Sequence, residues 1–169
     1  MSNNNQTSIR KEDANNRLIV EREFNAPVSQ VWQAWTDSKI LDEWWAPKPW
    51  KAVTQSMNFS EGGTWFYYMQ GPYGTKSYCR ADFHTIVPYK MYTGNDAFCD
   101  EGGNISNEMP VMHWNVSFGE TETGTKVKVE LTFESAADME KIIEMGFQEG
   151  FTAAHGNLDE LLAQQQLVA

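Results

Sequence analysis

The stretch VMHWNVSFGETETGTKVKVELTFE (111–134) predicts a β-hairpin in which two alternating strands flank a TETG turn. If Phe118 pairs with Val127 and Trp114 pairs with Leu131, the apolar residues of both strands lie on one face. These residues are Met112, Trp114, Val116, Phe118, Val127, Val129, Leu131 and Phe133. A sheet with one apolar face needs a second layer to cover it.

The sequence after the hairpin can supply this second layer. Ser135 can cap a helix over AADMEKIIEM (136–145), and a longer helix is expected from Phe147 to about Gln166. The long helix has one apolar stripe at helical spacing, which consists of Phe147, Phe151, Ala154, Leu158, Leu161 and Leu162. We therefore expect an α+β fold, in which a curved antiparallel sheet wraps around a long C-terminal helix.

The N-terminal part predicts one strand followed by two short helices. Residues 1–16 are polar and are expected to form a disordered lead-in, so that a single domain spans residues 17–169. RLIVEREF (17–24) alternates as a strand with one half-buried face. Two short helices follow it, and Asp37-Ser38 can cap the second of them.

The middle of the chain predicts strands and turns. Glycine and proline separate several alternating segments between Lys51 and Glu134, as expected for an antiparallel sheet. GNDAFCDEGGNISNE (94–108) is rich in glycine, asparagine and acidic residues. We expect this segment to be a solvated acidic loop.

This order of segments resembles the SRPBCC superfamily (START-like, helix-grip). Within it, the chain is similar to the homologues of the heat-shock protein 90 ATPase activator. The matching segments are EREFNAPVSQVWQAWTD (21–37), LDEWWAP (41–47), GGTWFY (62–67), GTKVKVELTF (124–133) and GFTAAHGNLDELL (150–162). The resemblance implies a helix-grip fold. It also implies either a chaperone-associated domain or a binder of lipid-like or polyketide-like ligands.

The chain departs from the family pattern in two places. His155 and Gly156 stand where the family usually has a leucine and a polar residue, and Ala46 stands where the family has a glycine after two tryptophans. Both departures fall in the segments that carry the resemblance.

Composition excludes several classes of partner. The 169 residues include 13 Lys and Arg against 23 Asp and Glu, so the net charge is −10. This charge argues against binding to nucleic acid or to an anionic membrane surface. The chain has no apolar run of about 20 residues and no signal-peptide pattern, so we expect a cytoplasmic protein.

The sequence indicates no metal, cofactor or catalytic site. The histidines His84, His113 and His155 are far apart, and the two cysteines form no CxxC pair. Nucleophile motifs and phosphate-binding glycine loops are absent from the sequence. We therefore assign no metal ligand, no cofactor and no catalytic residue.

Seven residues are expected to bind a ligand between the sheet and the long helix. The apolar wall is expected to consist of Trp45, Phe83, Met112, Trp114 and Phe151. Arg22 has the inward parity of its strand and must meet a carboxylate, backbone carbonyls, water or a ligand, of which an ion pair is favoured. His155 flanks the inward stripe of the long helix, where it is either a hydrogen-bonded wall residue, which is favoured, or a polar contact inside the cavity. If these two side chains hold the polar end, a ligand with an anionic or carbonyl end fits best.

The adjacent tryptophans raise a related question. Trp44 and Trp45 end the second short helix, and they could pack in the core, enclose a ligand or form a docking surface. We expect one indole to fill the core and the other to border the cavity.

Three functions remain open at this point. The preferred one is binding of a small hydrophobic or amphipathic molecule. The second is an enzyme of the same fold that uses His155 as acid or base. The third is a chaperone-associated interaction module, in which surface residues matter more than a cavity.

Overall fold

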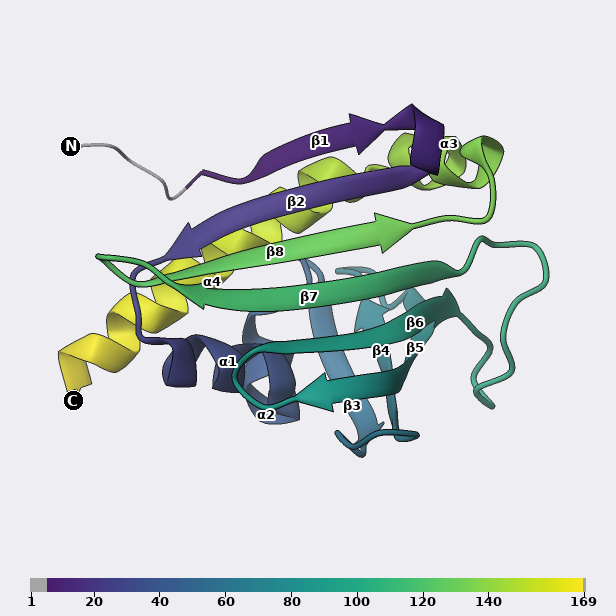
Figure 1. Cartoon of the computed structure of the whole chain (residues 1–169). Coiled ribbons are helices and arrows are strands. Elements are labelled where there is room, and N and C mark those ends of the chain that lie inside the picture. The colour runs from purple at the N-terminus through teal and green to yellow at the C-terminus, as the bar shows by residue number, and fades with distance from the viewer. Residues whose placement is uncertain (1–5, 169) are drawn as a thin grey trace.

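A computed structural model describes residues 6–168 of the chain, with side chains up to residue 165. Its strands form one eight-stranded antiparallel sheet in the order β1-β2-β8-β7-β6-β5-β4-β3 (Figure 1). The strands are β1 (Ser8–Glu12), β2 (Arg17–Phe24), β3 (Lys51–Met57), β4 (Thr64–Gln70), β5 (Lys76–Val87), β6 (Met91–Phe98), β7 (Met112–Glu120) and β8 (Thr125–Thr132). The helices are η1 (Asp13–Asn15), α1 (Val28–Thr36), α2 (Ser38–Trp44), α3 (Ala136–Glu144) and α4 (Phe147–Val168).

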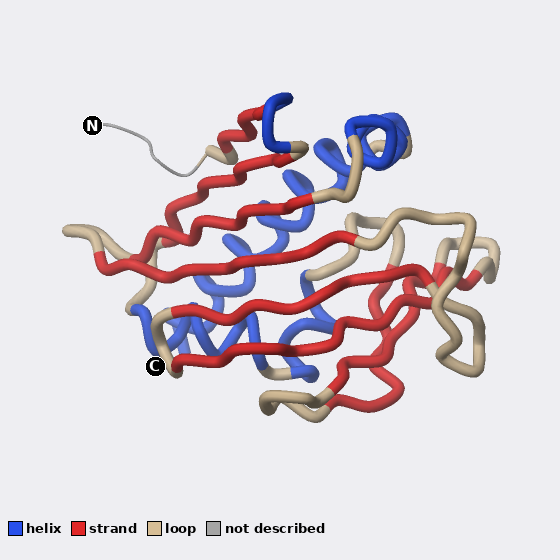
Figure 2. The backbone as a smooth tube through the Cα atoms, turned by 45° about the vertical axis from the view of Figure 1, so that its right-hand side comes forward, coloured by secondary structure: helices blue, strands red, loops and turns tan. Residues whose placement is uncertain are grey.

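The α-helices lie on one side of the curved sheet. Figures 1 and 2 show α4 running along this side, with α1 and α2 near one end of the sheet and α3 near the other. This arrangement buries the apolar stripe of α4, because Phe151, Ala154, Leu158 and Leu162 are each at most 6% exposed. The expected helix-grip architecture is confirmed.

The predicted hairpin register is also confirmed. Phe118 pairs with Val127 and Trp114 pairs with Leu131. The face that these residues share is buried, whereas the alternate face of β7 and β8 is not. Strand parity could predict this result because each one-residue shift would have turned the apolar set toward water.

Both predicted helix caps are present. The Asp37 carboxylate accepts a hydrogen bond from the Lys39 backbone N–H at 2.9 Å, and the Ser135 hydroxyl accepts one from the Asp138 N–H at 3.1 Å. Gly146 follows α3 with a φ of +89°, a conformation that glycine adopts without strain. This glycine allows α4 to begin one residue later.

The prediction of a disordered lead-in is wrong for residues 8–15. Ser8–Glu12 forms β1, which pairs along β2, and Asp13–Asn15 form a short 3-10 helix. A polar edge strand gains its order from the backbone hydrogen bonds of its neighbour, and composition does not register that gain. Residues 1–5 of the predicted lead-in lie outside the described residues.

The prediction of a loop over residues 94–108 is wrong at its N-terminal end. Strand β6 continues to Phe98, and Asp96 pairs with Ala81 on one side and Met112 on the other. Gly94 is needed for close packing, because a Cβ there would lie 2.5 Å from the carbonyl oxygen of Asp82. Gly94 therefore marks a close approach of β6 to β5 and not a turn.

Candidate functional site

The two adjacent tryptophans have different roles. Trp44 is 0% exposed, and its Nε1 donates a hydrogen bond to the Ala34 carbonyl at 3.0 Å. Trp45 is 8% exposed, and its Nε1 donates to the Tyr67 hydroxyl at 3.2 Å. Trp44 fills the core, while Trp45 borders a cavity. Neither indole is available as a docking surface.

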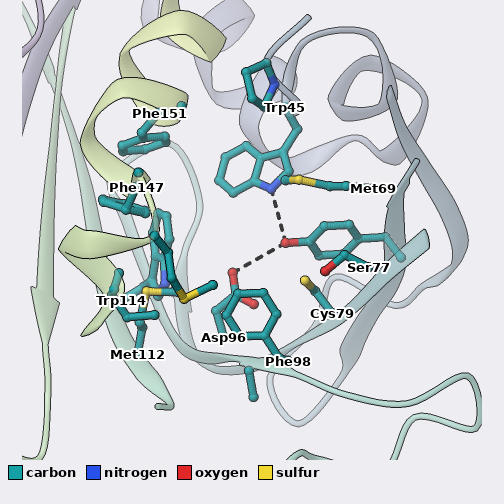
Figure 3. Close-up of a pocket in the computed structure, with 17 residues that line it drawn as sticks. Trp45, Met69, Ser77, Cys79, Asp96, Phe98, Met112, Trp114, Phe147 and Phe151 are labelled. Atoms are coloured by element: carbon teal, nitrogen blue, oxygen red, sulfur yellow. Dashed lines mark hydrogen bonds between the residues drawn. The ribbon is translucent and has the colours of Figure 1, made fainter. Parts of the chain in front are cut away.

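This cavity has a volume of about 230 Å³ and lies between the sheet and the junction of α3 with α4 (Figure 3). Aromatic and aliphatic side chains form most of its lining. They come from the segment after α2, from β4, β6 and β7, and from α3, α4 and the junction between these helices: Trp45, Pro47, Met69, Ala97, Phe98, Met112, Trp114, Ile142, Met145, Phe147 and Phe151. The cavity is therefore an apolar chamber bordered by the start of the long helix.

The polar side chains of the lining are Tyr67, Ser77, Cys79 and Asp96, from three neighbouring strands. The Tyr67 hydroxyl lies 3.5 Å from Asp96 Oδ2, the outer limit of a hydrogen bond, and it also accepts the hydrogen bond from Trp45. Figure 3 shows both contacts as dashed lines that meet between Trp45 and Asp96. A chain of polar atoms thus crosses one side of the cavity.

The Asp96 carboxyl is the charged group of this chain of atoms. It is 7% exposed, and burial raises its pKa to about 7, an effect only partly offset by hydrogen bonds from Tyr67 and from the Ala97 backbone N–H. Near neutral pH this carboxyl therefore exists in both protonation states. Any ligand that interacts with one state better than the other will shift the balance.

The neighbouring groups remain protonated. Burial and the nearby Asp96 carboxylate raise the pKa of Tyr67 and of Cys79 well above their usual values. Cys79 is thus a buried thiol with little thiolate character, which agrees with its inward parity in the sequence. It contributes surface to the cavity and not a nucleophile.

Four of the seven predicted ligand-binding residues line the cavity. They are Trp45, Met112, Trp114 and Phe151. Phe83 instead packs against Phe59, with ring centroids 4.8 Å apart, and borders a separate void of about 30 Å³, roughly the space of one water molecule. Parity thus predicted the positions of Met112, Trp114 and Phe151 in the apolar wall, but not the contributions of β4, β6 and the α3–α4 junction.

Arg22 lies outside the cavity lining and is paired within the protein. It is 5% exposed, and its guanidinium forms an ion pair with Asp159 of α4. Nη1 donates to the Glu23 carbonyl at 2.7 Å, and the guanidinium carbon lies 5.0 Å from the centre of the Phe24 ring. The sequence presented an ion pair and a ligand as alternatives for Arg22, and the ion pair is confirmed.

His155 also lies outside the cavity lining. Its ring centroid is 4.2 Å from that of Phe151, and its Nδ1 is hydrogen bonded to the Thr7 hydroxyl at 2.8 Å. Burial, with a smaller effect of Arg22, lowers its pKa to about 3. Nε2 has no hydrogen-bond partner among the described residues. This neutral, enclosed imidazole is not suited to acid or base catalysis near neutral pH.

Sequence reasoning overlooked Tyr67 and Asp96 as site residues. The usable signal was the two-residue period of β6, where Tyr92, Gly94 and Asp96 are all buried. The Gly-Asn-Asp order suggested a turn and ended the predicted strand too early. Tyr67 alternates with Trp65 and Met69 in the same manner in β4.

Residues 6–168 contain no group of three side chains suited to hold a metal ion. His84 and His113 stack on each other with centroids 6.0 Å apart, and both are exposed, while His155 is buried. Within the same residues, no helix is long and apolar enough to cross a membrane.

A family described as activator of Hsp90 ATPase homolog 1-like protein matches residues 25–163. The chain is also similar to a solved protein from Arthrobacter aurescens, at 35% identity and a TM-score of 0.88, covering 93% of this chain and 91% of that one. A protein from Mycobacterium smegmatis shares 28% identity with a TM-score of 0.86, covering 92% and 96% of the two chains. No curated protein is significantly similar.

Proposed function

The chain belongs to the family of activator of Hsp90 ATPase homolog 1-like proteins, and we propose that it binds a small amphipathic molecule in the cavity between its sheet and α4. One observation carries this proposal. The cavity combines an apolar wall of aromatic and aliphatic side chains with polar atoms gathered on the strands β4, β5 and β6. Ligand sites typically join a large apolar surface with a few polar groups that fix orientation.

The volume limits the size of the ligand. An engineered apolar cavity of about 150 Å³ accommodates benzene, whereas sites for drug-sized molecules occupy about 300 Å³ or more. At about 230 Å³, this cavity fits one ring or a short chain with a polar substituent. We assign apolar contacts to Trp45, Met112, Trp114 and Phe151.

The polar end of the ligand is assigned to Tyr67 and Asp96. The sequence suggested Arg22 and His155 for this role, but both side chains lie outside the cavity lining. Arg22 already has Asp159 as its partner, and His155 has Thr7. Among the polar side chains of the lining, we assign this role to the hydroxyl of Tyr67 and the carboxyl of Asp96, which contact each other, while Ser77 and Cys79 add a hydroxyl and a thiol nearby.

A cavity-blocking variant tests the proposal. Gly150 lines the cavity, and apart from the backbone of its own helix a Cβ at this position would meet Pro47 Cγ, at 3.7 Å, as its one neighbour within 4 Å among the described residues. The variant Gly150→Leu should therefore fold, place a side chain at the cavity wall, and gain helix propensity of about 1 kcal/mol. We expect it to bind 4-methylphenol at least about tenfold more weakly than the wild type, as measured by tryptophan fluorescence.

Gly156→Leu is the matched control. Gly156 lies in the same helix and is exposed, and a Cβ added there would meet no atom of the described residues within 4 Å, apart from the backbone of its own helix. This control should bind 4-methylphenol like the wild type. Equal affinity of both variants and the wild type would contradict the proposed cavity.

Chaperone association is a second candidate function, and the family match favours it. The test is the ATPase rate of a purified Hsp90-class chaperone with and without the chain. A stimulated rate that Gly150→Leu leaves unchanged would place this activity away from the cavity. Because Trp44 and Trp45 are buried, such a surface would have to use other side chains.

A further inference from the structure

We propose that the ligand's polar end is a protonated amine, held by the Asp96 carboxylate in front of an aromatic wall. This inference rests on the function proposed above and adds the charge of the group that the cavity accepts. It reverses the anionic or carbonyl end expected from the sequence. The reversal follows from which charged side chain actually borders the cavity.

Asp96 gives the cavity its charge. Among the described residues that line the cavity, it is the one with a formal charge, since no lysine, arginine or histidine lines it. Its hydrogen-bond donors are the Tyr67 hydroxyl at 3.5 Å and the Ala97 backbone N–H. A carboxylate has about four acceptor positions, and a buried charge without a counter-charge is costly. An ammonium group supplies both the missing donors and the missing charge.

Aromatic rings form the wall of the cavity near Asp96. Phe147 and Phe151 lie with ring centroids 5.3 Å apart, and Trp114 lies 5.6 Å from Phe151. Figure 3 shows these three rings along one side of the cavity, with Asp96 near one end and Trp45 near the other. Aromatic rings attract cations through their π faces, most strongly once water is excluded. The same rings supply apolar surface for the rest of the ligand.

Charge excludes the opposite ligand class. A carboxylate or phosphate in this cavity would meet the Asp96 charge, and the described lining has no basic side chain to offset it. The N-terminal turn of α4 borders the cavity, and a helix N-terminus carries about half a positive charge. That is smaller than the full charge of Asp96, and Glu149 in the same turn opposes it further.

A neutral ligand would satisfy fewer of the polar groups in the cavity than an amine. An alcohol could donate one hydrogen bond to Asp96, but it would leave the buried charge without a counter-charge. The indole N–H of Trp114 is buried and has no partner among the described residues. It can serve an acceptor atom elsewhere on the same amine. The net charge of −10 also favours the approach of cations.

The experiment compares three probes of similar shape: 2-phenylethylammonium, 2-phenylethanol and 3-phenylpropanoate. They are titrated into the full chain at about pH 8, where Asp96 is mostly ionised and an alkylammonium is still protonated. Tryptophan fluorescence reports binding, because Trp45 and Trp114 line the cavity. We expect the ammonium probe to bind most tightly and the carboxylate probe least tightly.

Variants identify the group responsible. Asp96→Asn keeps the side-chain shape and should weaken binding of the ammonium probe by about tenfold to a hundredfold. Binding of 2-phenylethanol should weaken clearly less, because it loses no charge–charge attraction. Glu149→Gln removes one negative charge at the N-terminal turn of α4, outside the lining, and should change the affinity for the two charged probes much less than Asp96→Asn does. Circular dichroism checks that each variant is folded.

The outcomes separate the two proposals. If 2-phenylethanol or 3-phenylpropanoate binds as tightly as the ammonium probe, the amine assignment is overturned while the cavity remains a binding site. The same holds if Asp96→Asn keeps its affinity for the ammonium probe. If the wild type binds none of the probes, both the amine assignment and the proposed function fail.

Discussion

Two polar clusters both reach Phe151, and they differ in how their charged groups are paired. The arginine cluster consists of Thr7, Arg22, His155 and Asp159, and the aspartate cluster consists of Trp45, Tyr67 and Asp96. Phe151 contacts both, with centroid distances of 4.2 Å to His155 and 5.8 Å to Trp45. In the first cluster a carboxylate neutralises the guanidinium, whereas in the second the carboxylate borders a cavity.

The difference teaches how to distinguish a structural charge from a binding group. An ion pair between a buried arginine and a carboxylate that is 33% exposed contributes mainly to the arrangement of the elements it joins, here β2 and α4. A buried charge beside open space keeps unused interaction capacity, which a ligand can satisfy. Arg22 and Asp96 are about equally buried, so burial does not distinguish them. The difference is that Arg22 has a carboxylate partner, whereas Asp96 borders a cavity.

The largest expected effect comes from breaking the arginine cluster. Asp159→Ala leaves the guanidinium of Arg22 buried without its carboxylate, so the free energy of unfolding should fall by about 3 kcal/mol. Urea unfolding near neutral pH measures the change. Glu160→Gln is the control, because its pair with Lys48 is exposed and should contribute less than about 1 kcal/mol. Equal effects of the two substitutions would remove the proposed distinction.

Removing the charge of the aspartate cluster should raise the free energy of unfolding instead of lowering it. The pKa of Asp96 is raised from 3.8 to about 7, so its contribution to stability is fully present below pH 3.8 and is lost as the pH rises through 7. Asp96→Asn should therefore stabilise the fold by about 2 kcal/mol at pH 8, after allowance for the needs of the buried amide. Near pH 4 the variant and the wild type should be similar in urea unfolding. A variant less stable than the wild type at pH 8 would indicate that a positive group of the protein neutralises the Asp96 carboxylate.

The smallest effect is expected at His155, which tests whether the arginine cluster touches the ligand. Its pKa is lowered from 6.5 to about 3, so the stability it contributes as a neutral ring is lost as the pH falls below 6.5. His155→Leu removes this loss and should raise the free energy of unfolding by about 1 kcal/mol at about pH 5.5. Affinity for 4-methylphenol should not change, since His155 is outside the cavity lining. Weaker binding by this variant would restore His155 as a ligand contact.

Much of the fold was predictable because its signals are local. The period of two in β7 and β8 determines which side chains face α4, and the cap residues Asp37 and Ser135 mark where helices begin. The same parity identifies the apolar wall of the cavity at Met112 and Trp114. These predictions needed only the geometry of one element and its nearest neighbour.

The polar end of the site was not predictable by the same route. Parity placed Arg22 and His155 inward, but it could not show that Asp159 and Thr7 occupy them. Conversely, Asp96 lies in a segment whose composition suggests a turn, and only the close approach of Gly94 to β5 reveals a continuing strand. The identity of a neighbour across the fold depends on tertiary packing, which sequence periodicity does not contain.

Strand β1 has a consequence for how molecules of this protein behave toward one another. It is one of the two outer strands of the sheet, and its five residues SIRKE include Arg10, Lys11 and Glu12. Short, charged outer strands discourage the pairing of sheets from different molecules, which is the first step of aggregation. Without β1, the apolar strand β2 would present its open backbone edge to solvent. The polar N-terminal strand thus covers an edge of the sheet at which other molecules could otherwise pair.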